Sequence, residues 1–408
     1  MKRYQWMGIM LSLVLLLCSC GTDKEVEKKA GESTSTPSAT ATVTPPISED
    51  EAFSEAEKIV KTMTIEQKVG QMFLVDLLQL DASPSVDGTA YKATDSMKQA
   101  IIDYHLGGVY LTKENIKSQK QTKKLVQNLQ ASVVSGSALY VAVEEDGGGE
   151  NSISAKVEDL KDTGYVTPKE MGQNMTANQI YESGKTIAGE LTKIGINLNL
   201  APVADLASAQ NPSYAMRCLG SDADGVADLL DDFVSGMREG GLSVTLKTFP
   251  GIGNVSADVT ESIAENTDSL MTIRDTNFVP YASGIQAGAD CVMVSNAAYS
   301  KLTVKKVPAF MSQDIVTKLL REELGFDGIV MTSPLNDNVI ENNYTNEFAV
   351  VEAVKAGCDL IVLPGNFKEC YEALITAVEE GRIDEKVINT SVRRILQNKI
   401  QRGILVLE

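Results

Sequence analysis

The sequence predicts a closed (β/α)8 barrel of the TIM type, in one domain behind a leader and a tether. Two observations lead to this prediction. Short, almost continuously apolar runs alternate with amphipathic helical segments through most of the chain, which is typical of parallel strands buried on both faces. Eight such runs can be identified, and eight strands close a parallel barrel. A doubly wound open sheet is the alternative that the pattern alone leaves open.

The eight predicted strands are 72–77, 108–111, 139–143, 196–200, 242–247, 291–295, 328–332 and 360–363. Helices are predicted between them, among others over 177–191, 223–239, 313–324 and 367–380, with a last one over 385–402. Ahead of the first strand, apolar residues recur at helical spacing from Ala52 to Met63, and Thr64 with Gln67 predicts a capping box for the next helix. No change in composition divides residues 51–408, so we predict one domain there.

The N-terminus predicts export. Residues 1–19 combine a basic start with a short apolar run, as in a secretory signal. The run 17–20, Leu-Cys-Ser-Cys, resembles a bacterial lipobox, and we expect Cys20 to carry the lipid. The following residues, 20–50, are rich in Ser, Thr and Pro and predict a disordered tether. An uncleaved anchor or an ordinary signal peptide is the alternative. In each case we expect the barrel to lie outside the cytoplasm, held at the cell membrane through the lipid anchor.

Composition excludes several classes of function. The formal net charge is −18, and it becomes −20 without the leader, which holds Lys2 and Arg3. Such a chain repels nucleic acid and anionic lipid headgroups. With one histidine, His105, no His-based zinc site can form, and we expect a structural role for it. The four cysteines beyond the leader contain no CxxC pair. We therefore predict no metal and no cofactor, and a disulfide is permitted but not implied.

The stretch 246–262, LKTFPGIGNVSADVTES, begins at the end of a predicted strand and continues as a long irregular loop, the place where barrels carry their chemistry. Together with 325–335, GFDGIVMTSPL, it resembles the signature of family-3 glycoside hydrolases, close to the bacterial β-N-acetylglucosaminidases (β-N-acetylhexosaminidases). Four more stretches resemble the family in the same order, at 63–72, 195–205, 320–328 and 391–396. The resemblance covers nearly all of residues 60–403 and implies the barrel fold.

The resemblance also implies where the catalytic groups should stand, and there the chain departs from the family. Ser333 occupies the position of the nucleophilic aspartate after strand seven, and Thr260 that of the acid/base histidine. Asp258, which orients that histidine in the family, is kept. A neutral hydroxyl cannot stabilise an oxocarbenium-like state by charge, and threonine does not titrate near neutral pH. The pattern therefore favours a barrel that has lost its hydrolytic pair.

Other positions implied by the resemblance would hold the sugar. The predicted substrate-binding residues are Glu144, Asp205, Arg217, Lys247 and Thr248. The family's binding arginine is replaced by Gly149, and a second basic position by Ser152. Asn296 stands where the sixth strand usually supplies a histidine.

Three hypotheses follow. The first is a degenerate glycosidase barrel that binds a glycan, such as a peptidoglycan-type N-acetylglucosaminide, or serves as a scaffold for an envelope protein. The second is an active hydrolase of O-glycosyl bonds with relocated carboxylates, for which Glu261 and Asp337 are the leading pair. The third is a structural lipoprotein whose barrel mouth is filled by side chains. The arrangement of carboxylates at the ends of the strands distinguishes them.

Overall fold

The structure is a computed structural model that describes residues 47–133, 137–148 and 166–407. These residues belong to one compact unit. The predicted leader, the tether with Cys20, and the positions of Gly149 and Ser152 lie outside the described residues. Among the helices that are described, none is long and apolar enough to cross a membrane.

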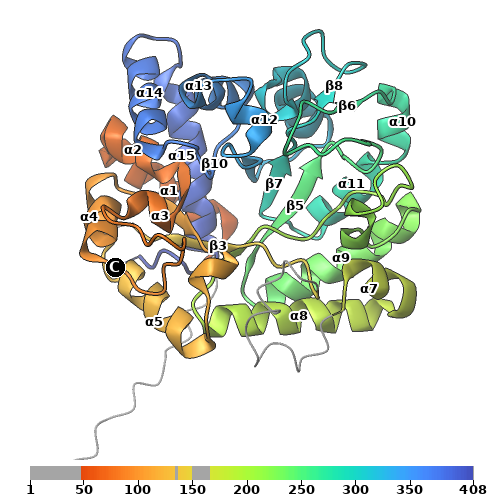
Figure 1. Ribbon diagram of the computed structural model, residues 1–408, viewed down its shortest axis with the longest axis horizontal. Coiled ribbons are helices and arrows are strands. Elements are labelled where there is room, and N and C mark those ends of the chain that lie inside the picture. Colours follow the sequence, from red (N-terminus) through yellow and green to blue (C-terminus); the bar gives the residue numbers. More distant parts are fainter. Residues whose placement is uncertain (1–46, 134–136, 149–165, 408) are drawn as a thin grey trace, which may run out of the picture. The chain divides into compact units, whose positions relative to one another are not determined.

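The described residues form a parallel eight-stranded barrel in the sheet order β10-β1-β2-β3-β4-β5-β7-β9, which confirms the predicted fold class (Figure 1). A parallel bridge between Met331 and Leu360 joins the two ends of the sheet. The barrel strands are β1 (Phe73–Asp76), β2 (Gly108–Tyr110), β3 (Tyr140–Val143), β4 (Leu198–Asn199), β5 (Ser243–Phe249), β7 (Cys291–Val294), β9 (Ile329–Thr332) and β10 (Ile361–Val362). Each lies within or overlaps a predicted strand.

The strands form because their residues are apolar on both faces. Every residue of β3, β7 and β9 is buried, one face against the barrel interior and the other against the surrounding helices. β4 and β10 are regular over only two residues. A short two-stranded parallel sheet that the sequence did not predict, β6 (Glu265–Asn266) with β8 (Ala298–Tyr299), is formed by the connections after β5 and β7.

Helices surround the barrel (Figure 1). They are α1 (Glu49–Thr62), α2 (Ile65–Gln71), α3 (Leu77–Leu80), α4 (Asp95–Asp103), α5 (Gln119–Gln130), α7 (Pro168–Asn174), α8 (Ala177–Lys193), α9 (Ala223–Glu239), α10 (Leu270–Asp275), α11 (Phe278–Gln286), α12 (Asn338–Glu341), α13 (Asn346–Ala356), α14 (Phe367–Glu379) and α15 (Glu385–Gln401). Short helical turns occur at η1 (Lys113–Asn115), η3 (Tyr214–Arg217) and η4 (Ala309–Met311), and η5 (Asp314–Glu323) is a helix with wide, π-type turns.

Local sequence explains where these helices begin. The predicted capping box at α2 is present, with Thr64 and Gln67 exchanging hydrogen bonds of 2.9 and 3.3 Å, which satisfies two free N–H groups of the first turn. Helix α9 has the predicted bounds. The segment predicted as a helix over 313–324 is helical, but its turns are wider than those of an α-helix.

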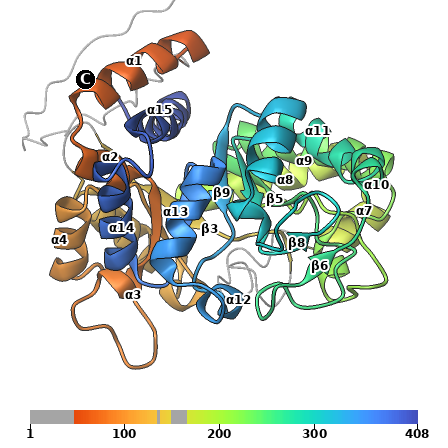
Figure 2. The ribbon, with the colours of Figure 1, turned by 90° about the horizontal axis from the view of Figure 1, so that it is seen from above.

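Helix α15 crosses the end of the barrel where the strands begin, and α1 packs along it (Figure 2). Lys399 on α15 is fully buried there and donates to the Gln71 side chain and to the carbonyls of Gly107 and Ala138. His105 stands just before β2 at this same end. The one histidine is therefore at the end of the barrel opposite to the catalytic positions, which follow the strands.

Candidate active site

A cavity of about 730 Å³ opens where the strands end, the face on which a (β/α)8 barrel carries its active site. Eight of the ten barrel positions predicted from the sequence line this cavity: Glu144, Arg217, Lys247, Thr248, Asp258, Thr260, Ser333 and Asp337. The other two, Asp205 and Glu261, do not. Because the cavity is open, side chains do not fill the barrel mouth. This finding speaks against the hypothesis of a structural lipoprotein with a filled mouth.

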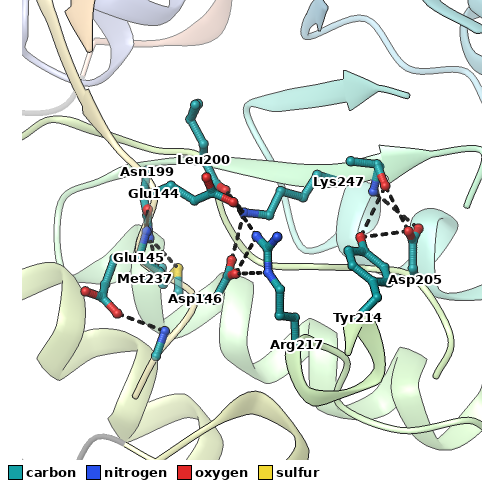
Figure 3. Close-up of polar contacts among 12 residues, drawn as sticks. Glu144, Glu145, Asp146, Asn199, Leu200, Asp205, Tyr214, Arg217, Met237 and Lys247 are labelled. Atoms are coloured by element: carbon teal, nitrogen blue, oxygen red, sulfur yellow. Dashed lines mark hydrogen bonds and ion pairs between the residues drawn. The ribbon is translucent and has the colours of Figure 1, made fainter. Parts of the chain in front are cut away.

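A network of four charges stands at one wall of the cavity, and three of its members, Glu144, Arg217 and Lys247, line the cavity itself (Figure 3). The Lys247 ammonium, whose side chain is 3% exposed, lies 2.7 Å from Glu144 Oε1 and 2.8 Å from Asp146 Oδ1. It also donates to the carbonyl of Leu200. Arg217 donates from Nε to Asp146 Oδ2 at 2.7 Å and forms a second ion pair with Glu144. Ion pairs therefore join the segment that follows β3 to strand β5 and to the turn η3.

This network fixes the protonation of Glu144. Burial alone would raise the pKa of its carboxyl, but the Lys247 ammonium and the Arg217 guanidinium outweigh burial and hold that pKa well below its usual range. Glu144 is therefore an ionised hydrogen-bond acceptor and does not serve as a proton donor. Its side chain is 40% exposed, into the cavity, where it can accept from a sugar hydroxyl.

Asp205 lies behind the cavity wall and is fully buried. Its carboxylate accepts from the hydroxyls of Tyr214, Tyr281 and Thr248, each at 2.9 Å. It also accepts from the backbone N–H groups of Thr248 and Ile252, at 3.2 and 3.0 Å. Both oxygens are thus engaged by the protein, and Asp205 holds the loop after β5 in place.

The two substituted catalytic positions are each used by the protein itself. Ser333 is 5% exposed and donates its hydroxyl to the carbonyl of Val294 at 2.9 Å. Thr260 donates its hydroxyl to Asp258 Oδ1 at 2.7 Å, and its N–H reaches the same oxygen at 2.9 Å. A serine whose proton is given to a carbonyl has no base to activate it. Asp258 therefore accepts hydrogen bonds within a turn of its own loop, and position 260 offers no imidazole for it to orient.

Asp337 has the most perturbed carboxyl in the cavity. Burial raises its pKa to about 7, and the negative charges of Asp258, Glu144 and Glu261 act in the same direction. Asn296 opposes them by donating from Nδ2 to Asp337 Oδ2 at 2.8 Å. Asp337 is therefore present as both the acid and the carboxylate at neutral pH.

Glu261 does not join Asp337 in the cavity. Its carboxylate accepts from the Asn338 side chain at 2.9 and 3.1 Å, and the N–H of Val339 donates to the Thr260 carbonyl at 2.7 Å. These contacts fasten the loop after β5 to α12, so that Thr260 and Ser333 line the same cavity. The loop therefore remains at the barrel mouth.

Sequence reasoning missed two tyrosines that line the cavity, Tyr110 and Tyr214. Tyr214 stands three residues before Arg217 on η3, and the guanidinium lies 5.7 Å from the centre of its ring. Two residues three apart on a helical turn lie on the same face, so the sequence already indicated that Tyr214 and Arg217 are neighbours. The role of Asp146 as counter-ion to Lys247 and Arg217 depends on how three chain segments meet, which no single stretch of sequence indicates.

The described residues contain no cluster of three or more His, Cys, Asp or Glu side chains placed to hold a metal ion. The cysteines in this part of the chain, Cys218, Cys291, Cys358 and Cys370, are buried free thiols. The polar groups of the cavity are thus carboxylates, hydroxyls, the amides of Gln210, Asn211 and Asn296, and two paired cations, which suits the hydroxyl-rich surface of a sugar.

Comparison with known proteins identifies the family of the barrel. The glycosyl hydrolase family 3 N-terminal domain matches residues 64–398. The chain belongs to glycoside hydrolase family 3. It is 26% identical over 369 residues to a β-hexosaminidase A of Pseudoalteromonas piscicida, covering 83% of this chain and 61% of the relative. A β-hexosaminidase of Xylella fastidiosa (strain M23) is 29% identical over 266 residues, or 64% of this chain and 77% of the relative.

Solved structures resemble this family-3 barrel closely. A family-3 β-N-acetylglucosaminidase from Paenibacillus sp. str. FPU-7 has a TM-score of 0.75 and 29% identity, covering 85% of this chain and 64% of that one. The β-N-acetylhexosaminidase of Beutenbergia cavernae DSM 12333 has a TM-score of 0.71 and 28% identity, covering 83% and 98%. The chain thus spans less than two thirds of the Pseudoalteromonas and Paenibacillus proteins.

Proposed function

We propose that this family-3 barrel binds a glycan of the N-acetylglucosaminide type without hydrolysing it. The observation that carries the proposal is a cavity of about 730 Å³ that keeps hydrogen-bonding groups while its two catalytic positions hold Ser333 and Thr260. A barrel that had lost both catalysis and ligand would be free to fill this space. The ionised Glu144 and the hydroxyls of Tyr214 and Thr248 are suited to hold sugar hydroxyls.

A second candidate function is hydrolysis with relocated carboxylates, and Asp337 favours it. An acid with a pKa of about 7 is suited to protonate a leaving-group oxygen near neutral pH. Its partner would be Asp258, because Glu261 is held by Asn338 outside the cavity. We rank this candidate second, since the hydroxyl of Thr260 already occupies one oxygen of Asp258.

We further propose that the protein works outside the cytoplasm, attached to the cell membrane by a lipid on Cys20. The basic and apolar leader with its lipobox-like Leu-Cys-Ser-Cys at 17–20 supports this location. A tether of about 30 residues would let the barrel reach glycan near the membrane. An envelope protein is the alternative partner.

The test combines binding and turnover on one preparation. Calorimetry with β-1,4-linked chito-oligosaccharides should give saturable binding, and aryl N-acetylglucosaminides and aryl glucosides should not be cleaved above background. Turnover that is lost in Asp337→Asn and Asp258→Asn but kept in Asp231→Asn, a matched change at an exposed site on α9, would establish the relocated-carboxylate enzyme instead. Absence of both binding and turnover would contradict both candidates.

A further inference from the structure

The buried cation of the cavity is already enclosed by the protein (Figure 3). Three oxygens surround the Lys247 ammonium, from Glu144, Asp146 and the carbonyl of Leu200. An ammonium has three N–H donors, so Lys247 has no contact left to offer a sugar. A bound ligand therefore has to find its hydrogen-bond donors on other side chains.

Most hydroxyls of the cavity are used in the same way. Among those that are buried or half-buried and described, Tyr214 and Thr248 donate to Asp205, Thr260 donates to Asp258, and Ser333 donates to the carbonyl of Val294. Tyr110 is different. It is half-buried and lines the cavity, but its hydroxyl forms no hydrogen bond with any described residue. The proton of this hydroxyl is therefore available to a ligand.

The register of the barrel places Tyr110 beside Glu144. Tyr110 ends β2 and is paired with Ala142 of β3, so these two residues point to the same face of the sheet. Side chains alternate along a strand, and Glu144, two residues after Ala142, points to that face as well. Both Tyr110 and Glu144 line the cavity. A donor and an acceptor therefore stand side by side at the ends of neighbouring strands.

The two groups have fixed protonation states. Burial, and then the negative charges of Glu144 and Asp146, raise the pKa of the Tyr110 hydroxyl well above its usual value, so this hydroxyl keeps its proton. Glu144 is ionised, and its contacts with Lys247 and Arg217 both fall on Oε1. The second oxygen, Oε2, can therefore accept from a ligand.

An acetamide group matches this pair. Its carbonyl oxygen accepts a hydrogen bond and its N–H donates one, and the two are on different atoms. A sugar hydroxyl carries its donor and its acceptor on a single atom. The acetamide also carries a methyl group, and the apolar side chains of Met293 on β7 and Val362 on β10 line the same cavity. Each part of an acetamide thus has a suitable partner here.

We propose that Tyr110 is a binding residue that recognises the N-acetyl group of the glycan. Its hydroxyl donates to the acetamide carbonyl oxygen, and Oε2 of Glu144 accepts from the acetamide N–H. This inference rests on the proposed glycan binding and specifies which residues select the ligand. Removing the Tyr110 hydroxyl would leave the acetamide oxygen without a donor, and this loss falls on ligands that carry an acetamide.

The experiment compares two disaccharides on the full chain in mild detergent. Calorimetry at pH 7 measures the affinities for the β-1,4-linked N-acetylglucosamine disaccharide and for the β-1,4-linked glucose disaccharide, which differ only in the group on carbon 2 of each sugar. We expect the N-acetylated disaccharide to bind about tenfold more tightly. Tyr110→Phe removes the hydroxyl and keeps the ring, and it should reduce this preference to less than about threefold by weakening the N-acetylated ligand alone.

Tyr344→Phe is the matched control. Tyr344 is half-buried and does not line the cavity, so this variant should keep the preference. Where Tyr110→Phe fails to fold, saturation-transfer nuclear magnetic resonance on the wild type carries the test. The acetamide methyl protons should then receive the strongest saturation of the bound disaccharide, because they lie against Met293 and Val362.

The outcomes separate the inference from the proposed function. Equal affinities of the wild type for the two disaccharides, an unchanged preference in Tyr110→Phe, or weak saturation of the acetamide methyl would overturn the inference while glycan binding stands. Equal losses for both disaccharides in Tyr110→Phe would also overturn it, because Tyr110 would then support the cavity without recognising the acetamide. Binding of neither disaccharide to the wild type would overturn the proposed function and the inference with it.

Discussion

The variant Asp205→Asn tests whether Asp205 supports the structure of the site or contacts the sugar directly. In the wild type the carboxylate accepts five hydrogen bonds, two of them from backbone N–H groups, of Thr248 on one oxygen and Ile252 on the other. An asparagine has only one side-chain oxygen, so one of these N–H groups must face an amide NH2. The tyrosine and threonine hydroxyls can reorient and become acceptors, but a backbone N–H cannot.

The expected loss follows from that geometry. A buried donor without a partner costs about 1–3 kcal/mol, and we expect Asp205→Asn to lower the free energy of unfolding by about 2 kcal/mol. Asp205→Ala removes the acceptor for all five donors and should cost more, roughly 4 kcal/mol, because both backbone N–H groups then lose their partner. Asp231→Asn, the same chemical change at an exposed site, should stay within about 0.5 kcal/mol of the wild type.

Guanidinium unfolding followed by circular dichroism measures these differences, and calorimetry on the folded variant measures affinity for the glycan. We expect a lower unfolding midpoint together with an affinity that changes less than tenfold. An Asp205→Asn variant as stable as the wild type but unable to bind glycan would refute this reasoning, because Asp205 would then be a direct ligand of the sugar.

Three further predictions concern the catalytic positions, the perturbed carboxyl and the anchor. Thr260→His combined with Ser333→Asp should give weak cleavage of an aryl N-acetylglucosaminide while neither single change does, because the two groups act as a unit; activity in either single variant would contradict this. Since the pKa of Asp337 is raised to about 7 from about 4 in the unfolded chain, its ionised form is disfavoured in the fold. The free energy of unfolding of the wild type should therefore fall, relative to that of Asp337→Asn, as the pH rises from about 4 to about 7. Unfolding midpoints that change with pH in parallel in the two proteins would contradict the raised pKa of Asp337. Cys20→Ala should release the protein from membranes or leave an uncleaved precursor, and a wild-type protein found in the aqueous phase of a detergent separation would contradict lipid anchoring.

The sequence predicted the fold well because the barrel depends on local pattern. The predicted strands 291–295 and 328–332 contain the continuously apolar runs 291–294 and 329–331, a composition typical of strands buried on both faces. The short strands β4 and β10 were harder to delimit, since their regular pairing covers two residues each. The wide turns of η5 and the small β6–β8 sheet left no clear periodic signal.

The site was predictable in its positions but not in its contacts. Motif resemblance located Lys247, Ser333 and Thr260 near the cavity, because each follows or ends a recognisable strand. It could not show that Asp205 faces inward or that Glu261 turns to Asn338. Those outcomes depend on loops from different strands packing together, and no single segment of sequence encodes them.

The most direct test of glycan binding without hydrolysis is a time course of the anomeric proton signals of a β-1,4-linked hexosaminide disaccharide mixed with the full chain, followed by nuclear magnetic resonance. One spectrum reports binding through line broadening and hydrolysis through new reducing-end signals. We predict broadening that saturates with added protein and a disaccharide that stays intact over days. Accumulation of monosaccharide in proportion to protein concentration, or sharp unshifted signals at every concentration, would contradict the account.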